Sequence, residues 1–410
     1  MKICIVSTQY PPLTATGGIA TFVGIAAPIL ARRGHKVTVI SVSRDGSDTR
    51  TVVDGVELWR LPETRPRATL REDLRRNWQV WRAVSQIKPD MVQMVDFRAE
   101  GFLTAILSSK RTGLVTLLDC HRTLTKVRRE EPFSFHQEAL SFMALRQARR
   151  SQAVFASSVF LARQVERDSK FKPDSIQAIY HALNMAEINI FRQTSPEISV
   201  SGAYIIYFGR VEERKGMEYL AKALPQVWQK LPYLKVVLAG LYSPYSIEGQ
   251  PVRQYFEELA GRFASNLVFT GHLAREQVLP LVAKAKLAVL PSIWEPFGFT
   301  CAEALALGVP VVTTGDSGGP GEIIGGLNDN EVEPDSVPAG WLVPRRNSVA
   351  LASAIIEALT DLEAQATVKK RLEKRLHRFE AERMVDKIEA LYFEIYRKLG
   401  KFSQNPGVEL

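Results

Sequence analysis

The sequence is poor in cysteine and has no long apolar run. Its three cysteines, Cys4, Cys120 and Cys301, lie far apart and have no metal-site spacing. An odd, sparse set is typical of a reducing compartment rather than of a disulfide framework. No apolar stretch approaches the ~18 residues that a membrane-spanning helix needs. The N-terminal MKICIVST lacks the longer apolar region of a signal peptide, so we interpret it as a buried strand.

The composition is otherwise that of a globular protein, with 46% hydrophobic and 24% charged residues among 410. At roughly 100–200 residues per domain, this length predicts two or three domains. Positive charge is unevenly distributed. Between Arg60 and Arg150, lysine and arginine outnumber aspartate and glutamate by 18 to 10, which is nearly all of the net charge of +9. Such a segment either attracts an anionic partner or is an ordinary solvated surface.

Short apolar runs alternate with helical patterns along the chain. The predicted strands include KICIVST, KVTVISV, MVQMV and GLVTLLD in the first half, and AYIIYFG, LKVVLAG, LVFTG, KLAVLPS and VPVVTT in the second. This alternation predicts parallel sheets with helices on both faces. We therefore expect an α/β chain of two doubly wound, Rossmann-like domains facing a central cleft. In such sheets ligands bind beyond the carboxyl ends of the strands.

The predicted boundary lies in NMAEINIFRQTSPEISVSG, which has no clean strand or helix period. We expect an N-terminal domain over 1–190, a linker over 191–202, a second domain over 203–375 and a helical segment and tail over 376–410. The C-terminal segment has a long amphipathic pattern, of one helix or two, that is expected to return across the domains.

The stretch EPFGFTCAE, from Glu295 to Glu303, lies between a predicted strand and a predicted helix. We expect the helix to begin near Thr300, so that free backbone N–H groups face the carboxyl end of the strand. A helix N-terminus suits a phosphate, and the Glu303 carboxylate suits hydroxyl donors such as those of a ribose. Taken alone, each glutamate is equally well explained by a structural role.

The segment FGRVEERKG follows another predicted strand. Arg210 supplies a planar fork and Lys215 a point charge, and both suit a diphosphate. Two cations at this place would stabilise a departing nucleoside diphosphate. Surface salt bridges with Glu212 and Glu213 are the alternative explanation.

In the first half, Gly17 and Gly18 open the first predicted helix and permit close backbone approach to a phosphate. The chain has neither the GxGxxG fingerprint after its first strand nor a GxxxxGK[ST] loop. The strand GLVTLLD runs into Asp119 and His121, either of which is a candidate for contact with a sugar hydroxyl or the reacting centre. A structural role is the alternative for each.

Together these motifs resemble the family 4 retaining glycosyltransferases of GT-B fold, the glycosyl transferases group 1. The resemblance runs from Met1 to about residue 360 and rests on three segments: the E-x7-E block with its trailing GVPVV, FGRVEERKG, and PPLTATGGIATFVGIAAPILARRGHKVTV. It implies that a sugar moves from a UDP- or GDP-linked donor to a hydroxyl on a glycan, lipid or small molecule. It also implies front-face displacement, with no cofactor, no metal and no nucleic-acid partner.

The resemblance also implies residue roles. Lys215 and Arg210 would hold the donor diphosphate, Glu303 the ribose and Glu295 the transferred sugar, while His121 falls at the position of the cleft histidine. The predicted catalytic residues are His121, Arg210, Lys215 and Glu295. The predicted donor-binding residues are Gly17, Gly18, Gly209, Arg210, Lys215, His272, Leu273, Phe297, Gly298, Phe299, Thr300 and Glu303.

The chain departs from the family pattern in three places. YHALN, with His181 and Asn184, stands where YNGVD is usual, so a hinge or acceptor detail is expected to differ. LYSP replaces a glycine-rich turn after VVLAG, and an acidic insertion, LNDNEVEPDSVPA, follows Ile324. The insertion has no functional account, and Glu322 is interpreted as structural.

Two other classes of protein remain. One is a GT-B-like sugar-nucleotide epimerase, and the other binds a membrane surface or acidic polymer through the Arg-rich segment. In LREDLRRNWQVWRAVSQI a stripe at helical spacing either faces the core, which is commoner, or lies on anionic lipid. The stripe consists of Leu70, Leu74, Trp78, Trp81, Val84 and Ile87. The expected location is the cytoplasm, with peripheral attachment to the inner face of the membrane left open.

Overall fold

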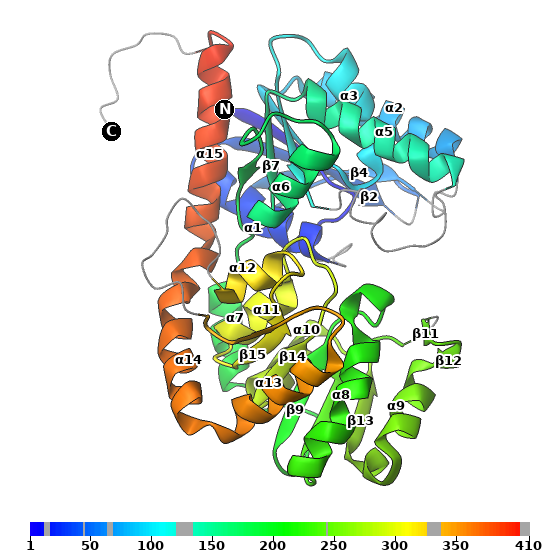
Figure 1. The fold of residues 1–410 in the computed structure, drawn as a ribbon. Helices are drawn as coiled ribbons and strands as arrows, with labels where there is room; N and C mark the ends of the chain where they lie inside the picture. The colour runs from blue at the N-terminus through cyan, green and yellow to red at the C-terminus, as the bar shows by residue number, and fades with distance from the viewer. Residues whose placement is uncertain are drawn as a thin grey trace. The chain divides into compact units, whose positions relative to one another are not determined.

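The computed structural model describes residues 1–11, 17–43, 46–63, 69–119, 134–242, 245–325 and 338–401. The chain folds into two compact units (Figure 1). The first unit comprises Met1–Ala182 and Ala381–Leu410, and the second comprises Leu183–Glu380. Each unit is built around a largely parallel sheet, which confirms the predicted α/β class. The acidic insertion lies outside the described residues.

The sheet of the first unit has the strand order β3-β4-β2-β1-β5-β6-β7-β8, and only the β3–β4 pair is antiparallel. The chain begins at the centre and builds outward from β1 in both directions. The order therefore reverses between β1 and β5, where a doubly wound sheet binds ligands. The strands are β1 (Lys2–Val6), β2 (Lys36–Ser43), β3 (Thr49–Val53), β4 (Val56–Pro62), β5 (Met91–Val95), β6 (Gly113–Leu118), β7 (Ala153–Ala156) and β8 (Gln177–Ala178).

Helices cover both faces of this sheet. Alternate residues of its central strand, β1, are therefore buried in two different apolar cores. Ile3 and Ile5 of β1 join the apolar core beneath α1 and α15, whereas Cys4 and Val6 join the core beneath α2. The helical segments of the unit are α1 (Gly18–Arg32), α2 (Leu70–Ile87), η1 (Phe97–Ala99), α3 (Phe102–Leu107), α5 (Phe135–Arg150), α6 (Val159–Asp168) and α15 (Ala381–Lys398).

The second unit has the strand order β13-β10-β9-β14-β15-β16, and every pair in it is parallel. Its order reverses between β9 and β14. The strands are β9 (Tyr204–Phe208), β10 (Lys235–Ala239), β13 (Leu267–Gly271), β14 (Leu287–Leu290), β15 (Val311–Thr314) and β16 (Trp341–Val343), with a separate hairpin of β11 (Ser246–Ile247) and β12 (Gln250–Pro251). The helical segments are α7 (Met185–Gln193), η2 (Glu213–Lys215), α8 (Met217–Lys230), α9 (Val252–Ala260), η3 (Gly261–Asn266), α10 (Arg275–Ala283), α11 (Phe299–Ala306), α12 (Gly319–Gly325), α13 (Ser348–Thr360), α14 (Leu362–Arg375) and η4 (Leu376–Phe379).

The C-terminal amphipathic pattern forms two helices rather than one. α14 belongs to the second unit, and after η4 the chain continues as α15, which belongs to the first. The apolar side of α15 packs into the core shared with α1, and the Tyr392 hydroxyl lies 2.5 Å from Gln93 Oε1 on β5. Arg33, at the end of α1, donates to Glu389 Oε2 at 2.8 Å. The last helix is therefore an integral part of the first unit.

The linker predicted at 191–202 begins in the last turn of α7, and this whole segment belongs to the second unit. None of the helices in the described ranges is both long and apolar enough to cross a membrane.

We predict that Ile388→Ala lowers the free energy of unfolding of the first unit by about 2–5 kcal/mol, because it opens a cavity beneath α15. Ile388 is fully buried in the core that α15 shares with α1. Glu394→Ala, on the exposed side of the same helix, is the control and is expected to cost no more than about 0.5 kcal/mol. Urea unfolding of both variants tests this, and equal losses would contradict the packing of α15.

Candidate functional site

Eight of the twelve predicted donor-binding residues follow β9 or β14, the neighbouring strands at which the order of the second sheet reverses. The loop after β9 and the loop after β14 are joined there by a backbone hydrogen bond. The Ile293 N–H donates to the Arg214 carbonyl at 2.7 Å. Two short loops thus form one surface at the position where an open α/β sheet binds its ligand.

Gly216 allows the first of these loops to lie against the second. Its φ of 68° is in the left-handed region, and it ends η2 and begins α8. A Cβ atom added there would lie 1.9 Å from the Pro291 carbonyl oxygen. Both the backbone conformation and the close approach therefore require glycine.

Glu295 is buried between two cations from the first loop. Arg214 Nη1 donates to Glu295 Oε2 at 2.7 Å, and Lys215 Nζ contacts Glu295 Oε1. All three side chains are at most 10% exposed. The Glu295 backbone N–H also donates to the Ser317 carbonyl at 2.8 Å, which fixes the loop beside α12. Glu295 therefore links three loops of the second unit, two through its carboxylate and the third through its backbone.

Burial and the neighbouring charges shift the pKa values of Glu295 and Lys215. Burial alone would raise the pKa of Glu295, but Arg214 and Lys215 outweigh it and lower that pKa to about 2. Burial has the opposite effect on the ammonium group. It lowers the pKa of Lys215 to about 8, assisted by the nearby Arg214 and opposed by Glu295. At neutral pH Arg214, Lys215 and Glu295 are all charged, and Arg214 Nε also pairs with the carboxylate of Glu212, which is 35% exposed. The two cations therefore face one buried carboxylate and one that is partly exposed.

The buried guanidinium in this cluster belongs to Arg214, which the sequence motifs did not indicate. Arg210, which they did indicate, is 75% exposed and lies 3.6 Å from Glu212. The sequence RVEERKG offers two arginines, and the 3-10 turn of η2 decides between them, because it turns Arg214 inward beside Lys215. The predicted donor contact of Arg210 stays a prediction.

The loop after β14 leads into α11, which begins at Phe299, close to the predicted Thr300. Gly298 has φ of 98° and its added Cβ would lie 2.7 Å from Pro320 Cγ, so it too requires glycine. The first turn of α11 faces the end of β9, since a Cβ added to Gly209 would lie 3.5 Å from Thr300 Cγ2. The helix start and the Lys215 cluster therefore occupy the same end of the sheet.

Glu303, on the second turn of α11, is buried and ion-paired. Arg275 Nη1 contacts Glu303 Oε1, and Arg275 Nε lies 3.0 Å from Glu187 Oε2. The pairing of Glu303 with Arg275 could not be foreseen from the sequence. Two further predicted residues, His272 and Leu273, connect β13 to α10; His272 is exposed and Leu273 half-buried.

In the first unit, Gly17 and Gly18 lie at the start of α1, as predicted. His121 lies outside the described residues, so its role stays a prediction. Asp119, the other candidate after β6, is buried, and its Oδ1 lies 2.9 Å from Nε2 of the fully buried His181. The departure from the family pattern at His181 therefore belongs to a buried polar pair. A small cavity at the β1–β5 switch point is lined by Val6, Ser7, Thr8, Gln9, Ile19, Val95, Phe97 and Glu100.

Two doubly wound units of this topology define the GT-B class of glycosyltransferase fold. A sucrose-phosphate synthase from Thermosynechococcus elongatus has a TM-score of 0.76 at 20% identity, over 97% of this chain and 99% of that one. Anabaena HepE, solved in complex with UDP and glucose, has a TM-score of 0.67 at 20% identity, over 96% and 100%.

Family models match both units. Residues 17–181 match the glycosyl transferase 4-like domain, and residues 192–375 match glycosyl transferases group 1. The chain belongs to the group 1 glycosyltransferases, whose substrates are a sugar-nucleotide donor and an acceptor. It is 26% identical to an uncharacterized glycosyltransferase of Methanocaldococcus jannaschii, over 88% of this chain and 90% of that protein. It is also 26% identical to the glycogen synthase of Mycobacterium tuberculosis, over 88% and 86%.

The two arginines give a matched test of the cluster. We predict that Arg214→Ala lowers the free energy of unfolding of the second unit by about 2–4 kcal/mol, because Glu295 then stays buried with only Lys215 beside it. Arg210→Ala removes an exposed side chain and is expected to cost no more than about 0.5 kcal/mol. Urea unfolding of both variants measures the difference, and a larger loss in Arg210→Ala would reverse the assignment.

Proposed function

We propose that this glycosyltransferase transfers a sugar from a nucleoside-diphosphate donor to an acceptor hydroxyl and retains the anomeric configuration. The observation that carries the proposal is the buried cluster of Arg214, Lys215 and Glu295 beside the N-terminus of α11. A buried ammonium group next to the N–H groups of a helix start suits a diphosphate. Charge in such a site stabilises a leaving group far more than it would in water.

The reaction follows from a site that favours departure of the diphosphate. The bond between the anomeric carbon and the phosphate oxygen breaks, and the acceptor oxygen bonds to that carbon on the same face. The acceptor proton passes to the departing phosphate oxygen, which acts as the base. Because the acceptor oxygen itself attacks the anomeric carbon, the reaction needs no protein nucleophile. Lys215 and the backbone N–H groups at the start of α11 would stabilise the negative charge that grows on the departing diphosphate. In this proposal they take the electrostatic role that a metal ion would otherwise have.

The donor is proposed to be a UDP- or GDP-linked sugar, and the acceptor a hydroxyl on a glycan, lipid or small molecule. HepE was solved with UDP and glucose, and the glycogen synthase of M. tuberculosis is a relative over most of its length. The sugar-nucleotide epimerase is the competing activity. An acceptor panel separates the two, because an epimerase interconverts donors without transfer.

We predict that Lys215→Ala lowers kcat/KM for the sugar nucleotide about 100- to 1000-fold, because a positive charge that stabilises the leaving diphosphate is lost. In the wild type, kcat/KM should fall as pH rises through about 8, where Lys215 loses its proton, and Lys215→Arg should move this decline to higher pH. Lys222→Ala, on the exposed side of α8, is the control and should leave kcat/KM unchanged. Initial rates with EDTA present measure these effects; full activity of Lys215→Ala would contradict the assignment.

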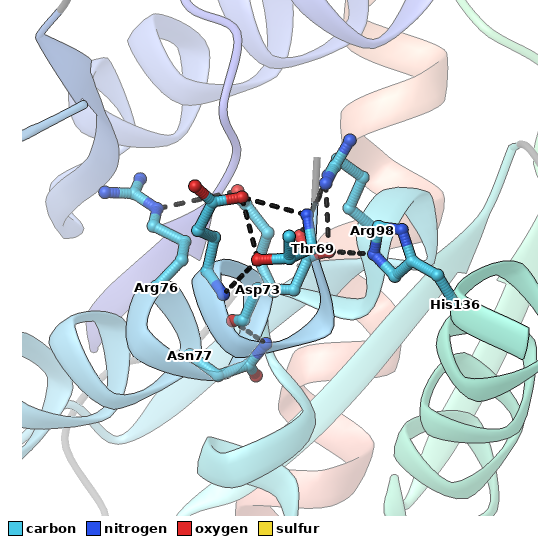
Figure 2. Close-up of polar contacts among 8 residues, drawn as sticks. Thr69, Asp73, Arg76, Asn77, Arg98 and His136 are labelled. Atoms are coloured by element: carbon cyan, nitrogen blue, oxygen red, sulfur yellow. Dashed lines mark hydrogen bonds and ion pairs between the residues drawn. The ribbon is translucent and has the colours of Figure 1, made fainter. Parts of the chain in front are cut away.

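A second candidate function rests on α2 of the first unit, a helix whose buried side is partly polar. Asp73 on α2 is fully buried and binds Arg98 at 2.8 and 2.9 Å and His136 Nε2 at 2.6 Å (Figure 2). One helical turn on, Arg76 donates to the Ser41 carbonyl at 3.1 Å and Asn77 accepts from a backbone N–H. These buried polar groups occupy the inner side of the first two turns of α2.

The outer side of α2 therefore carries apolar residues. Leu74 is 39% and Trp78 is 49% exposed, and the Trp78 and Trp81 rings lie 4.7 Å apart. The stripe, for which a core-facing and a lipid-facing position were both open, faces the core at Val84 and Ile87 and is exposed at Leu74 and Trp78. The reason is that buried polar contacts fix the rotation of the helix. Exposed arginines flank Trp78 at helical spacing, at Arg71, Arg75 and Arg82.

We further propose that this face of α2 attaches the enzyme peripherally to an anionic membrane surface. Exposed tryptophan and leucine between arginines have the composition of helices that bury aromatic rings at the headgroup boundary. The segment from Arg60 to Arg150 accounts for nearly all of the net positive charge of the chain. Attachment would bring the first unit to an acceptor embedded in the membrane.

We predict that the wild type sediments with phosphatidylglycerol vesicles at low salt and is released at high salt, because the attraction is electrostatic. The Leu74→Ala/Trp78→Ala variant should bind about tenfold more weakly, because its apolar contact with lipid is reduced. Tyr233→Ala, an exposed aromatic of the second unit, is the control and should bind as the wild type does. If the wild type stays in the supernatant at low salt, the proposed attachment is wrong.

A further inference from the structure

We propose that Arg275 is a positioning residue, which holds the Glu303 carboxylate in place for the ribose hydroxyls of the donor and is itself held by Glu187. The inference rests on the proposed function, because it takes the donor ribose as the partner of Glu303. It adds two residues to the donor site that neither the motifs nor the spacing of the sequence indicated. It also connects that site to α7, the first helix of the second unit.

The geometry is a bridge of three side chains from three helices. Arg275 is the first residue of α10; its Nη1 contacts Glu303 on α11, and its Nε lies 3.0 Å from Glu187 on α7. Glu303 is 7% exposed, whereas the side chains of Arg275 and Glu187 are about one-third exposed. One guanidinium therefore spans from a buried carboxylate to one nearer the surface.

The far end of this bridge is fixed by a helix cap. Asn184 is the N-cap of α7, and its Oδ1 accepts the Glu187 backbone N–H at 3.2 Å. Asn184 comes from YHALN, the segment in which the chain departs from the family pattern. The helices also pack directly, since α7 contacts both α10 and α11. The helix cap thus fixes the position of Glu187. The guanidinium of Arg275 is oriented by its contacts with Glu187 and Glu303.

This arrangement leaves Glu303 able to bind a ribose. A carboxylate offers about four lone-pair directions, and Arg275 contacts only Oε1. Burial raises the pKa of Glu303, while the charge and hydrogen bond of Arg275 oppose that rise. Without Arg275 the carboxyl group would take up a proton at higher pH. A protonated carboxyl is a weaker acceptor of ribose hydroxyls, so donor affinity would then fall as the pH falls.

Other charged groups around Glu303 act in known directions. Lys215 of η2 favours the carboxylate, and Glu187 of α7 disfavours it. Two further elements, α12 and η4, pack against α11. α12 carries Glu322, and η4 carries His377 and Arg378. Because Lys215 remains when Arg275 is removed, a shift in the pH dependence of donor binding reports the loss of Arg275 rather than the loss of every neighbouring cation.

The test compares Arg275→Met, which keeps an apolar stem but no charge, with the wild type and with Arg275→Lys. We expect the donor KM of Arg275→Met to rise about tenfold at pH 6.5 and the increase to shrink toward pH 9, while kcat at saturating donor stays within about twofold. Arg275→Lys should recover most of the affinity. Glu187→Gln should shift KM in the same direction but less. Arg253→Met on α9 is the control and should leave KM unchanged.

Calorimetry with UDP and GDP and their 2′,3′-dideoxy analogues isolates the ribose. Arg275→Met should lose affinity for the ribonucleotide but bind the dideoxy analogue as the wild type does, because that analogue has no hydroxyl for Glu303. Equal affinity of wild type and variant for the ribonucleotide across the pH range would overturn the role of Arg275 and leave the proposed function standing. A wild type that binds neither ribonucleotide would overturn both. If folded Arg275→Met lost the same affinity for the ribonucleotide as for the dideoxy analogue, the proposal would be overturned and Arg275 would have a structural role alone.

Discussion

The proposed donor site in the second unit depends on one buried carboxylate, Glu295, that contacts two cations. Glu295 neutralises part of the charge of Arg214 and Lys215 and connects the loops that follow β9 and β14. Burying Lys215 and Arg214 without Glu295 would be costly, and burying Glu295 alone equally so. We propose that the result is a preorganised cation at the switch point of the second sheet, which spends no reorganisation energy when the leaving group departs.

A second carboxylate acts at the other side of the same helix start. Glu295 lies before α11 and Glu303 lies within it, so the helix presents its N-terminus between two buried acidic groups. Each acid has its own arginine, Arg214 for Glu295 and Arg275 for Glu303. In the proposed donor site, Glu295 and Arg214 would hold Lys215 beside the phosphates, and Arg275 would hold Glu303 beside the ribose hydroxyls.

Much of this could be predicted from the sequence, because apolar periodicity and glycine placement are local signals. The central strands and the start of α11 follow from such patterns. The contact of Lys215 with Glu295 and the choice of Arg214 over Arg210 depend on how a 3-10 turn faces a neighbouring loop, which spacing does not encode. The sequence left the direction of the α2 stripe open, and it is decided at Trp78 by Asp73 and Arg76, which look like surface residues but are buried in polar contacts. The partnership of Arg275 with Glu187 and Glu303 arises only when three helices pack together.

The central claim is that the site expels a diphosphate and passes the sugar to the acceptor on the same face. The most direct measurement is the proton NMR spectrum of the anomeric hydrogen in product formed from an α-linked UDP- or GDP-sugar, recorded before any mutarotation. The account predicts an α-linked product, because the acceptor oxygen bonds to the anomeric carbon on the face from which the diphosphate departs. A β-linked product would contradict it, since inversion requires a base on the face opposite the departing diphosphate.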